Sequence, residues 1–592
     1  MAPDGPIAQV GVAAVAAAPV RMAGPRAGLL FAPLTTWLML AFAAPLAIVV
    51  LLSFQEQTSP FAPLVLELSG EQWRYLFDDS YYVGIILGTV LMGMVVAALC
   101  VLLGYPVALW IVGLPPAWRA AGIAIVLIPL LTNVVIRTVG MLLLLAPHGF
   151  LNAIFAWLGL PSGFNMLFTW GAIVASLVQV FMPFAILALF DNLQSIDGRL
   201  KEAAVVHGGR PARTFLDVTL PLSLPGIRAA LVVTFLLAST SYVTATFLGG
   251  LKIWISGMVV WSEALQVLNY RSAAAMAVTL LLIGIAYTVA VNLSTAALMP
   301  WTRPGRRRLP RLRLPTLGGP AMRAFDAVLE AVGPWIGRLL LLVALALLVF
   351  PLALVLIGSF NDVPEAFIAK WRGFTLRWYV KIFTDGLYTV PILNSFLLAL
   401  FAALVSVLLT VPAAYALVFL APKGRELWFS GFMLPLALPG VAVAIGMLFL
   451  LQAFTAVPPF FGLLLVHVVL VSPFMLSMLR ASMMQMDPAL EQAGISLGAR
   501  RFASFWRVTL PLLRPSILVA GVIAFLVSFG EVTVTAFLTT ARMQTLPVRM
   551  FADMGMVAEP TINAISALVI LGTMALLVLV NRFARLDNVW HR

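Results

Sequence analysis

Stretches of about 20 apolar residues dominate the chain and constrain its fold more than any other feature. A helix needs roughly 20 apolar residues to cross about 30 Å of hydrocarbon. On this rule each half of the chain holds six predicted spans, at approximately 29–54, 81–112, 119–146, 169–194, 227–250 and 271–299, then 334–360, 387–420, 426–455, 460–483, 515–540 and 562–583. The sequence therefore predicts an all-α polytopic membrane protein with about 12 transmembrane helices.

The composition excludes the main soluble classes. Hydrophobic residues make up 62% and charged residues 10% of the chain, against roughly 45–50% and about 25% in soluble domains. A net charge of +13 is explained here by arginines retained on the cytoplasmic side of a membrane, so no nucleic-acid partner is expected. One cysteine, Cys100, and four scattered histidines leave no basis for a disulfide or a metal site.

One polar stretch occurs twice. Residues 197–227 and 487–517 align without a gap at an offset of 290, and 13 of their 31 positions are identical. Upstream, matching residues lie 306 apart, for example Pro45 and Pro351. The difference places an insertion in the first half at about 147–168. Two halves with equal numbers of spans form a parallel repeat, related by a pseudo-twofold axis along the membrane normal.

The charged residues predict the orientation and the domain boundaries. Arginine and lysine collect in both repeated stretches and in an Arg- and Pro-rich linker at 300–333, whereas the loop at 55–80 is acidic. Positive loops stay in the cytoplasm, so we expect both termini and both repeats there. Residues 1–28 are expected to form a disordered cytoplasmic tail, followed by two membrane domains at 29–299 and 334–592.

The repeated stretch has the residue types of a helix-turn-helix that another protein can contact. Asp197 and Asp487 can cap a short helix, and small residues on that helix allow close approach of a second surface. Gly208 and Gly498 allow a turn, and Pro221 and Pro225 are expected to end the second helical piece before the next span. The alternative is an amphipathic loop helix without a partner, which the duplication disfavours.

These stretches resemble the EAA loop of bacterial ABC importer permeases, in which EAA precedes a glycine and a hydrophobic-Leu-Pro ending. The first copy matches at Glu202, Ala203, Ala204, Gly208 and Pro221. The second has Gln492, Ala493 and Gly494 in place of EAA, with Glu491 one residue early, and then Gly498 and Pro511. The resemblance implies that both loops couple the chain to an ATPase.

The resemblance covers nearly the whole chain. The first half is similar to one permease of the spermidine/putrescine systems, as in IRTVG at 136–140, and the second to its partner, as in SFN at 359–361. It implies two fused MetI-like ABC transmembrane type-1 domains in a bacterial inner membrane. It also implies a periplasmic or lipid-anchored solute-binding protein and two copies of a cytoplasmic ABC ATPase as partners.

The ATPase is not encoded in this chain. The sequence has no G-x-x-x-x-G-K-[ST] motif, which a phosphate-binding loop requires. We therefore expect no cofactor and no catalytic residue here, and we expect ATP and magnesium to be used by the partner.

Charged groups deep in a span tend to face a cavity or a partner, and Glu531 is the best candidate for the substrate pathway. Its equivalent in the first half is Ser241. Further polar candidates are Tyr242, Thr244, Thr533, Asn133 and Arg137. The alternatives are that Glu531 pairs internally or reaches the outer interface, and that Arg137 pairs structurally, for example with Glu531.

The leading functional hypothesis is an importer pore for a polyamine-like organic cation such as putrescine or spermidine. Ferric iron, thiamine and 2-aminoethylphosphonate stay open as substrates within the same class. A proton-coupled secondary transporter would also fit twelve spans in parallel halves. The loop at 113–120 lacks the acidic-basic signature expected of such carriers.

Overall fold

The computed structural model describes residues 26–56, 67–207, 210–250, 252–298, 320–368, 370–420, 424–453, 457–556 and 559–584. In these ranges every named element is helical, and the only pairing of extended backbone is two isolated bridges. The prediction of an all-α membrane protein is confirmed.

The first half runs from α1 to α14 and includes two π-helical turns, η1 and η2. Its elements are α1 (Arg26–Leu38), η1 (Met39–Ala43), α2 (Ala44–Leu52), α3 (Glu71–Asp78), α4 (Ser80–Gly113), α5 (Pro116–Leu131), α6 (Val134–Leu145), α7 (Phe150–Trp157), α8 (Trp170–Gln194), α9 (Gly198–Val206), α10 (Pro211–Thr214), η2 (Phe215–Thr219), α11 (Leu220–Ser239), α12 (Val243–Gly249), α13 (Ser256–Leu265) and α14 (Tyr270–Leu298).

The second half repeats this order. Its elements are α15 (Pro320–Gly358), α16 (Arg377–Thr384), α17 (Thr389–Tyr415), η4 (Ala416–Leu420), α18 (Arg425–Ala437), α19 (Gly440–Ala453), α20 (Pro459–Met484), α21 (Pro488–Ser496), α22 (Arg501–Ser504), η5 (Phe505–Thr509), α23 (Leu510–Phe529), α24 (Thr535–Leu538), α25 (Leu546–Met556) and α26 (Thr561–Ala584). The pairs α9/α21, α10/α22, η2/η5 and α11/α23 coincide residue for residue at the offset of 290.

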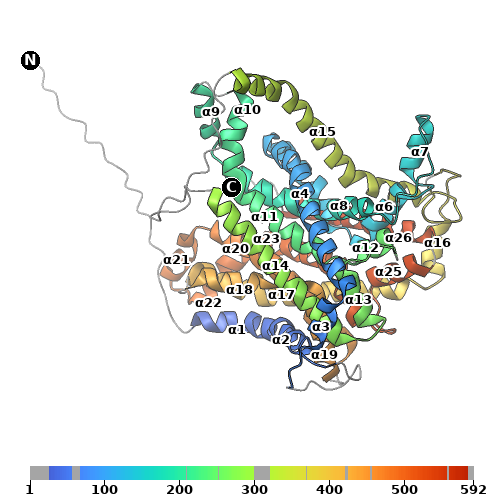
Figure 1. Cartoon of the computed structure of the whole chain (residues 1–592). Helices are drawn as coiled ribbons and strands as arrows, with labels where there is room; N and C mark the ends of the chain where they lie inside the picture. The colour runs from blue at the N-terminus through green and yellow to red at the C-terminus, as the bar shows by residue number, and fades with distance from the viewer. Residues whose placement is uncertain are drawn as a thin grey trace, which may run out of the picture.

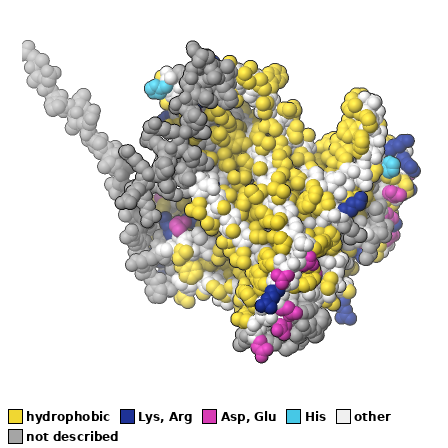
Figure 2. All heavy atoms as spheres, viewed as in Figure 1, with side chains coloured by type: hydrophobic (Ala, Val, Ile, Leu, Met, Phe, Trp, Pro, Cys, Tyr) yellow, Lys and Arg dark blue, Asp and Glu magenta, His cyan; other side chains and the backbone are white. Residues whose placement is uncertain are grey.

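Eleven helices in the described ranges are long and apolar enough to cross a membrane, or twelve if a pair bent by 86° (Arg425–Leu436 and Gly440–Gln452) is one span. Apolar side chains cover the central part of the face in Figure 2, and the charged side chains lie toward its margins. This distribution is the one expected of a protein surrounded by hydrocarbon.

Two pairs of predicted spans are broken. The span predicted at 119–146 is split into α5 and α6, and its repeat at 426–455 into α18 and α19. The spans predicted to end at 250 and 540 stop instead at Ser239 and Phe529, and short helices follow after extended or irregular backbone. At 438 the break has a local cause, since a residue that precedes a proline avoids the helical conformation.

The predicted linker at 300–333 is shorter than expected. Helix α15 begins at Pro320, because proline is well suited to the first helical position and the residues up to Ala331 contain no helix breaker. Residues 299–319 lie outside the described ranges, as do residues 1–25 of the predicted tail. Helix α1 begins at Arg26.

The predicted insertion at 147–168 contains α7 and a loop closed by one side chain. The Asn152 amide donates to the carbonyls of Ala146 (3.1 Å) and Phe164 (2.8 Å), and its oxygen accepts from the Gly163 and Phe164 amides at 3.0 Å each. This segment stands out at the upper right of Figure 1.

The two halves exchange their first spans. Helix α2 packs against α19 of the second half, and α15 packs against α6 of the first. A Cβ atom added at Gly446 would lie 1.9 Å from the Pro45 carbonyl oxygen, and one at Gly140 would lie 2.5 Å from that of Pro351. Both the glycines and the prolines are 306 residues apart, so the same contact is made twice. Figure 1 places α1–α2 and α15 along opposite edges of the molecule, consistent with a pseudo-twofold axis between them.

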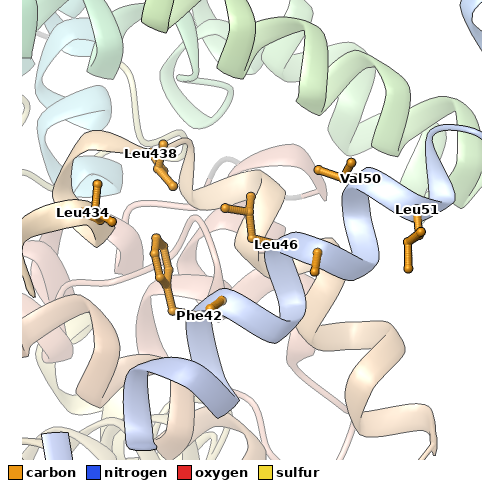
Figure 3. A pocket seen from close by; sticks show the side chains of 8 residues that line it. Phe42, Leu46, Val50, Leu51, Leu434 and Leu438 are labelled. Atoms are coloured by element: carbon orange, nitrogen blue, oxygen red, sulfur yellow. The ribbon is translucent and has the colours of Figure 1, made fainter. Parts of the chain in front are cut away.

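An apolar groove lies beside the exchanged first span of the first half. Its lining comes from η1, α2 and the end of α18, and Figure 3 shows Phe42, Leu46, Val50, Leu51, Leu434 and Leu438 around it. The groove offers hardly any polar surface, so it does not suit a hydrophilic solute.

Candidate functional site

The breaks in the spans meet in the interior of the molecule. A Cβ atom added at Gly530 would lie 3.6 Å from the Asn133 Cα atom, so the break at 530–534 lies against the start of α6. A Cβ atom at Gly440 would lie 3.3 Å from Val534, which brings the start of α19 to the same place. Irregular backbone at membrane depth is tolerated only where protein buries it or where it lines a cavity. The breaks therefore mark the candidate pathway.

Glu531 lies within this group of breaks. Its Oε1 atom accepts a hydrogen bond from the Val534 amide (2.7 Å), and its side chain is half-buried. Among the described residues, no lysine or arginine is within ion-pair distance of this carboxyl. Internal pairing of Glu531 is thus limited to backbone hydrogen bonds from Thr533 and Val534 of its own loop. A carboxylate without a cationic partner at this depth favours a cation that approaches it.

The first half contributes its own break at 240–242. The Tyr242 hydroxyl donates to the Thr533 carbonyl at 3.4 Å and is almost fully buried. Ser241 and Thr533 are half-buried, as Glu531 is. The structure therefore brings together four of the predicted pathway residues, three of them with partial access.

Aromatic rings pack around Tyr242. Its ring stacks on Trp261 of α13 (centroids 6.0 Å apart) and meets Phe551 of α25 and Phe537 of α24 edge to face, at 5.8 and 6.2 Å. Trp261 and Phe551 are 290 residues apart and contact each other at 5.9 Å. Equivalent residues can touch only near the axis that relates them. These four rings form the axial aromatic cluster, which lies beside the Glu531 loop because the Tyr242 hydroxyl contacts Thr533.

Three predicted pathway residues hold their own half together. Asn133 caps α6 through the Val135 amide (2.8 Å). The buried Arg137 guanidinium donates to the Val180 carbonyl (2.7 Å), and no ion pair with Glu531 is formed, so that suggested pairing is wrong. Thr244 lies 3.2 Å from the Thr138 hydroxyl of α6.

The repeated loops form the predicted short helices, α9 and α21. The Asp197 carboxylate accepts from the Arg199 amide (3.0 Å) and that of Asp487 from the Ala489 amide (2.9 Å), so both predicted caps are confirmed. The EAA-type positions keep one register in the two copies, with Glu202, Ala203, Gln492 and Ala493 exposed and Ala204 and Gly494 half-buried. Both helices lie at the left of Figure 1.

The turns after these helices were predicted at Gly208 and Gly498. Gly208 lies outside the described residues. Gly498 has φ 90°, a conformation that favours glycine. The prediction that Pro221 and Pro225 end a helical piece is wrong. Both lie within the continuous helix Pro211–Ser239, Pro221 two residues after the π-helical turn η2 and Pro225 inside α11.

Glu491 does not offer its carboxylate to a partner. It is buried, accepts from the Tyr415 hydroxyl through Oε1 and from the Thr509 hydroxyl through Oε2 (3.1 Å), and its carbonyl accepts from Ser504. The predicted coupling role for this side chain is therefore corrected: it anchors α21 to α17 and η5. Its equivalent in the first copy is Lys201, which cannot accept these bonds.

Replacing Glu491 by alanine is expected to destabilise the protein. Two hydroxyls lose their acceptor in a buried site, which costs about 1–3 kcal/mol. Thermal unfolding of the purified protein in detergent measures this as a lower Tm. Glu202→Ala is the matched control, because its side chain is exposed at the neighbouring motif position of the other copy. An equal Tm for both variants would contradict the anchoring role.

His467 and the contacting pair Trp261 and Phe551 were not among the predicted site residues. The alignment at offset 290 offered a signal for both, since His467 replaces Leu177 within an apolar span and Trp261 aligns with Phe551. Glu263 on α13 was not predicted either. Burial raises the pKa of its carboxyl, and the Tyr82 hydroxyl donates to it at 3.4 Å.

Parts of the chain are similar to known transport proteins. The chain is 31% identical over 247 residues to the spermidine/putrescine transport system permease protein PotB of Haemophilus influenzae, covering 41% of this chain and 85% of PotB. It is 25% identical over 246 residues to PotC of the same organism, covering 42% of this chain and 95% of PotC. A bacterial alginate ABC transporter, solved in complex with an alginate pentasaccharide-bound periplasmic protein, aligns with a TM-score of 0.39 at 19% identity over 46% of this chain and 94% of that chain. No family model matches.

Proposed function

Because the chain belongs to the spermidine/putrescine-type permease family of ABC importers, we propose that it forms the complete pore of an ATP-driven importer. Two relatives that are separate chains in one organism each match less than half of this chain and most of their own length. A fusion of two such permeases explains this coverage together with the duplicated order of helices.

The coupling partner we propose is a dimer of a cytoplasmic ABC ATPase, with one subunit on α9 and one on α21. Both helices expose a small alanine at equivalent positions and project from the same end of the molecule (Figure 1). Two equivalent sites suit a symmetric dimer. ATP and magnesium belong to that partner, and both termini of this chain share its side of the inner membrane.

The substrate we propose is a polyamine-like cation delivered by an extracytoplasmic solute-binding protein. The observation that carries this is Glu531, a half-buried carboxyl without a cationic partner among the described residues, placed where the breaks of both halves meet. The axial aromatic cluster lies beside this point, because Tyr242 contacts both Thr533 and the ring of Phe537. Ferric iron, thiamine and 2-aminoethylphosphonate are the competing substrates.

The test is uptake into proteoliposomes that contain the chain with its ATPase and binding protein. ATP-dependent accumulation of radiolabelled putrescine or spermidine is expected. Accumulation driven by a proton gradient without any ATPase would establish a secondary transporter instead. Transport of one of the competing substrates, with no polyamine uptake, would keep the importer and replace its substrate.

Bulky side chains at the coupling helices should uncouple the pore. Replacing Ala203 or Ala493 by tryptophan places a large ring on the exposed face on which the ATPase is proposed to bind, so co-purification of the ATPase is expected to fall about tenfold, the equivalent of roughly 1.4 kcal/mol. Ala153→Trp, an exposed alanine of α7, is the matched control. Unchanged co-purification of the Ala203 and Ala493 variants would contradict the docking site.

A further inference from the structure

One histidine joins both sides of the break that carries Glu531. His467 of α20 is buried, and its Nδ1 atom lies 2.7 Å from the Ser528 hydroxyl while its Nε2 atom lies 3.0 Å from the Thr535 hydroxyl. Ser528 is in the last turn of α23, and Thr535 is the first residue of α24. The imidazole therefore bridges the end of α23 and the start of α24. The Glu531 loop connects these two helix ends, so the imidazole fixes the distance across it.

The chemistry of these three groups is complementary without any charge. A neutral imidazole has one N–H donor and one acceptor nitrogen, and each hydroxyl can donate or accept. All three side chains are buried, and a buried polar group that lost its partner would be costly. The three residues thus form a hydrogen-bonded group in which each hydroxyl pairs with one ring nitrogen, and this pairing restricts the positions of all three side chains.

The first half builds the same break without this unit. At offset 290, His467, Ser528 and Thr535 correspond to Leu177, Ala238 and Ala245, all three fully buried and apolar. The break at 240–242 forms nonetheless. A histidine is therefore not needed to interrupt the span, so its presence in one half requires another explanation.

The presence of the histidine in the second half is explained by the residue that the loop of that half carries. The second half presents Glu531 where the first presents Ser241. A carboxylate at membrane depth is productive only if it is held toward the pathway, and the loop itself contributes only backbone hydrogen bonds to it, from Thr533 and Val534. We propose that His467 is a positioning residue, which with Ser528 and Thr535 holds the Glu531 carboxylate toward the solute and makes the second half the cation-selecting side of the pore. This inference rests on the proposed function and adds to it which half selects the solute.

The first experiment measures putrescine uptake per ATP hydrolysed in proteoliposomes of the complete importer. His467→Leu is expected to lower this ratio about tenfold, and His467→Gln, which keeps a donor and an acceptor, to restore it to within about threefold of the natural protein. The triple variant His467→Leu/Ser528→Ala/Thr535→Ala reproduces the apolar set of the first half, so it is expected to fold and still to show the low ratio. A normal ratio in the triple variant would overturn the proposal.

The second experiment needs no solute. Cys100 is the only cysteine of the chain, so in a Cys100→Ala background a single cysteine at Thr533 reports the loop of the second half and one at Ser241 the loop of the first. Adding the triple variant is expected to change the rate of thiol modification by a small charged methanethiosulfonate about fivefold at Thr533→Cys, because the local opening of that loop changes, and to leave Ser241→Cys unchanged. Equal rates at Thr533→Cys with and without the triple variant would overturn the proposal.

The two experiments separate the possible failures. If Glu531→Gln transports putrescine normally while the Thr533→Cys rate responds to the triple variant, the substrate pathway is wrong and the loop-positioning role of His467 stands. If Glu531→Gln loses uptake and neither readout responds to the His467 variants, the pathway stands and the positioning role is wrong.

Discussion

Replacing Glu531 by glutamine is expected to reduce ATP-dependent polyamine uptake by a factor of about ten to one hundred. A hydrogen bond to a charged group contributes about 1.5–3 kcal/mol, and each 1.4 kcal/mol corresponds to about tenfold. Glutamine keeps the size of the side chain and its acceptor for the Val534 amide, so the loop should stay in place while the negative charge is lost.

Initial rates of radiolabelled putrescine uptake measure this effect, normalised to the amount of assembled complex. Ser241→Ala is the comparison variant: it alters the equivalent pathway position of the first half without removing a charge, so a smaller loss is expected. A Glu531→Gln variant that transports at the natural rate, with an intact complex, would show that the carboxylate is not on the pathway.

The two contacts of α2 with α19 and of α15 with α6 form the seam between the halves. Adding a single methyl group at this seam is expected to have the second large effect. Gly446→Ala would place its Cβ atom 1.9 Å from the Pro45 carbonyl oxygen, and Gly140→Ala would place it 2.5 Å from that of Pro351. Backbone atoms cannot rotate away as a side chain does, so α19 and α2, or α6 and α15, must separate. Overpacking of a core typically costs 1–3 kcal/mol, and at Gly446 we expect about 3 kcal/mol or more.

The measurement is the yield of monodisperse protein and its Tm in detergent. Gly572→Ala in α26 and Gly521→Ala in α23 are matched controls, because each glycine lies within a membrane helix and a Cβ atom there would meet nothing within 4 Å. The expected order is a lower Tm for Gly140→Ala, the lowest for Gly446→Ala, and no loss for the controls. Equal Tm values for all four variants would contradict the close packing of the seam.

The spans were predictable because hydropathy is a local property, but the breaks within them were not. Pro106, Pro183 and Pro351 lie inside continuous helices, whereas Pro129 lies just before the break between α5 and α6. The same residue type thus has both outcomes, and neighbouring helices decide between them by satisfying or not satisfying the freed backbone groups. Periodicity along one segment does not contain that information.

The candidate site was predictable in part for a similar reason. Glu531 stands out in an apolar run, and the repeat leads directly to Ser241 and the neighbouring Tyr242. The partners of these residues depend on tertiary contacts: Arg137 binds a carbonyl of α8, and Glu491 binds α17 and η5. A charge in the sequence shows that a partner is needed, but only the fold shows which one it is.

The exchange of first spans has a consequence for the order in which this protein can be completed during synthesis. Helix α6 carries the Gly140 surface, and its neighbour across the seam, Pro351 of α15, is translated about 200 residues later. Until α15 enters the membrane, the first half has an open side that only lipid or a chaperone can cover. A fused gene supplies the missing helix from the same ribosome and in a fixed ratio, whereas two separate permeases must find each other by diffusion in the bilayer.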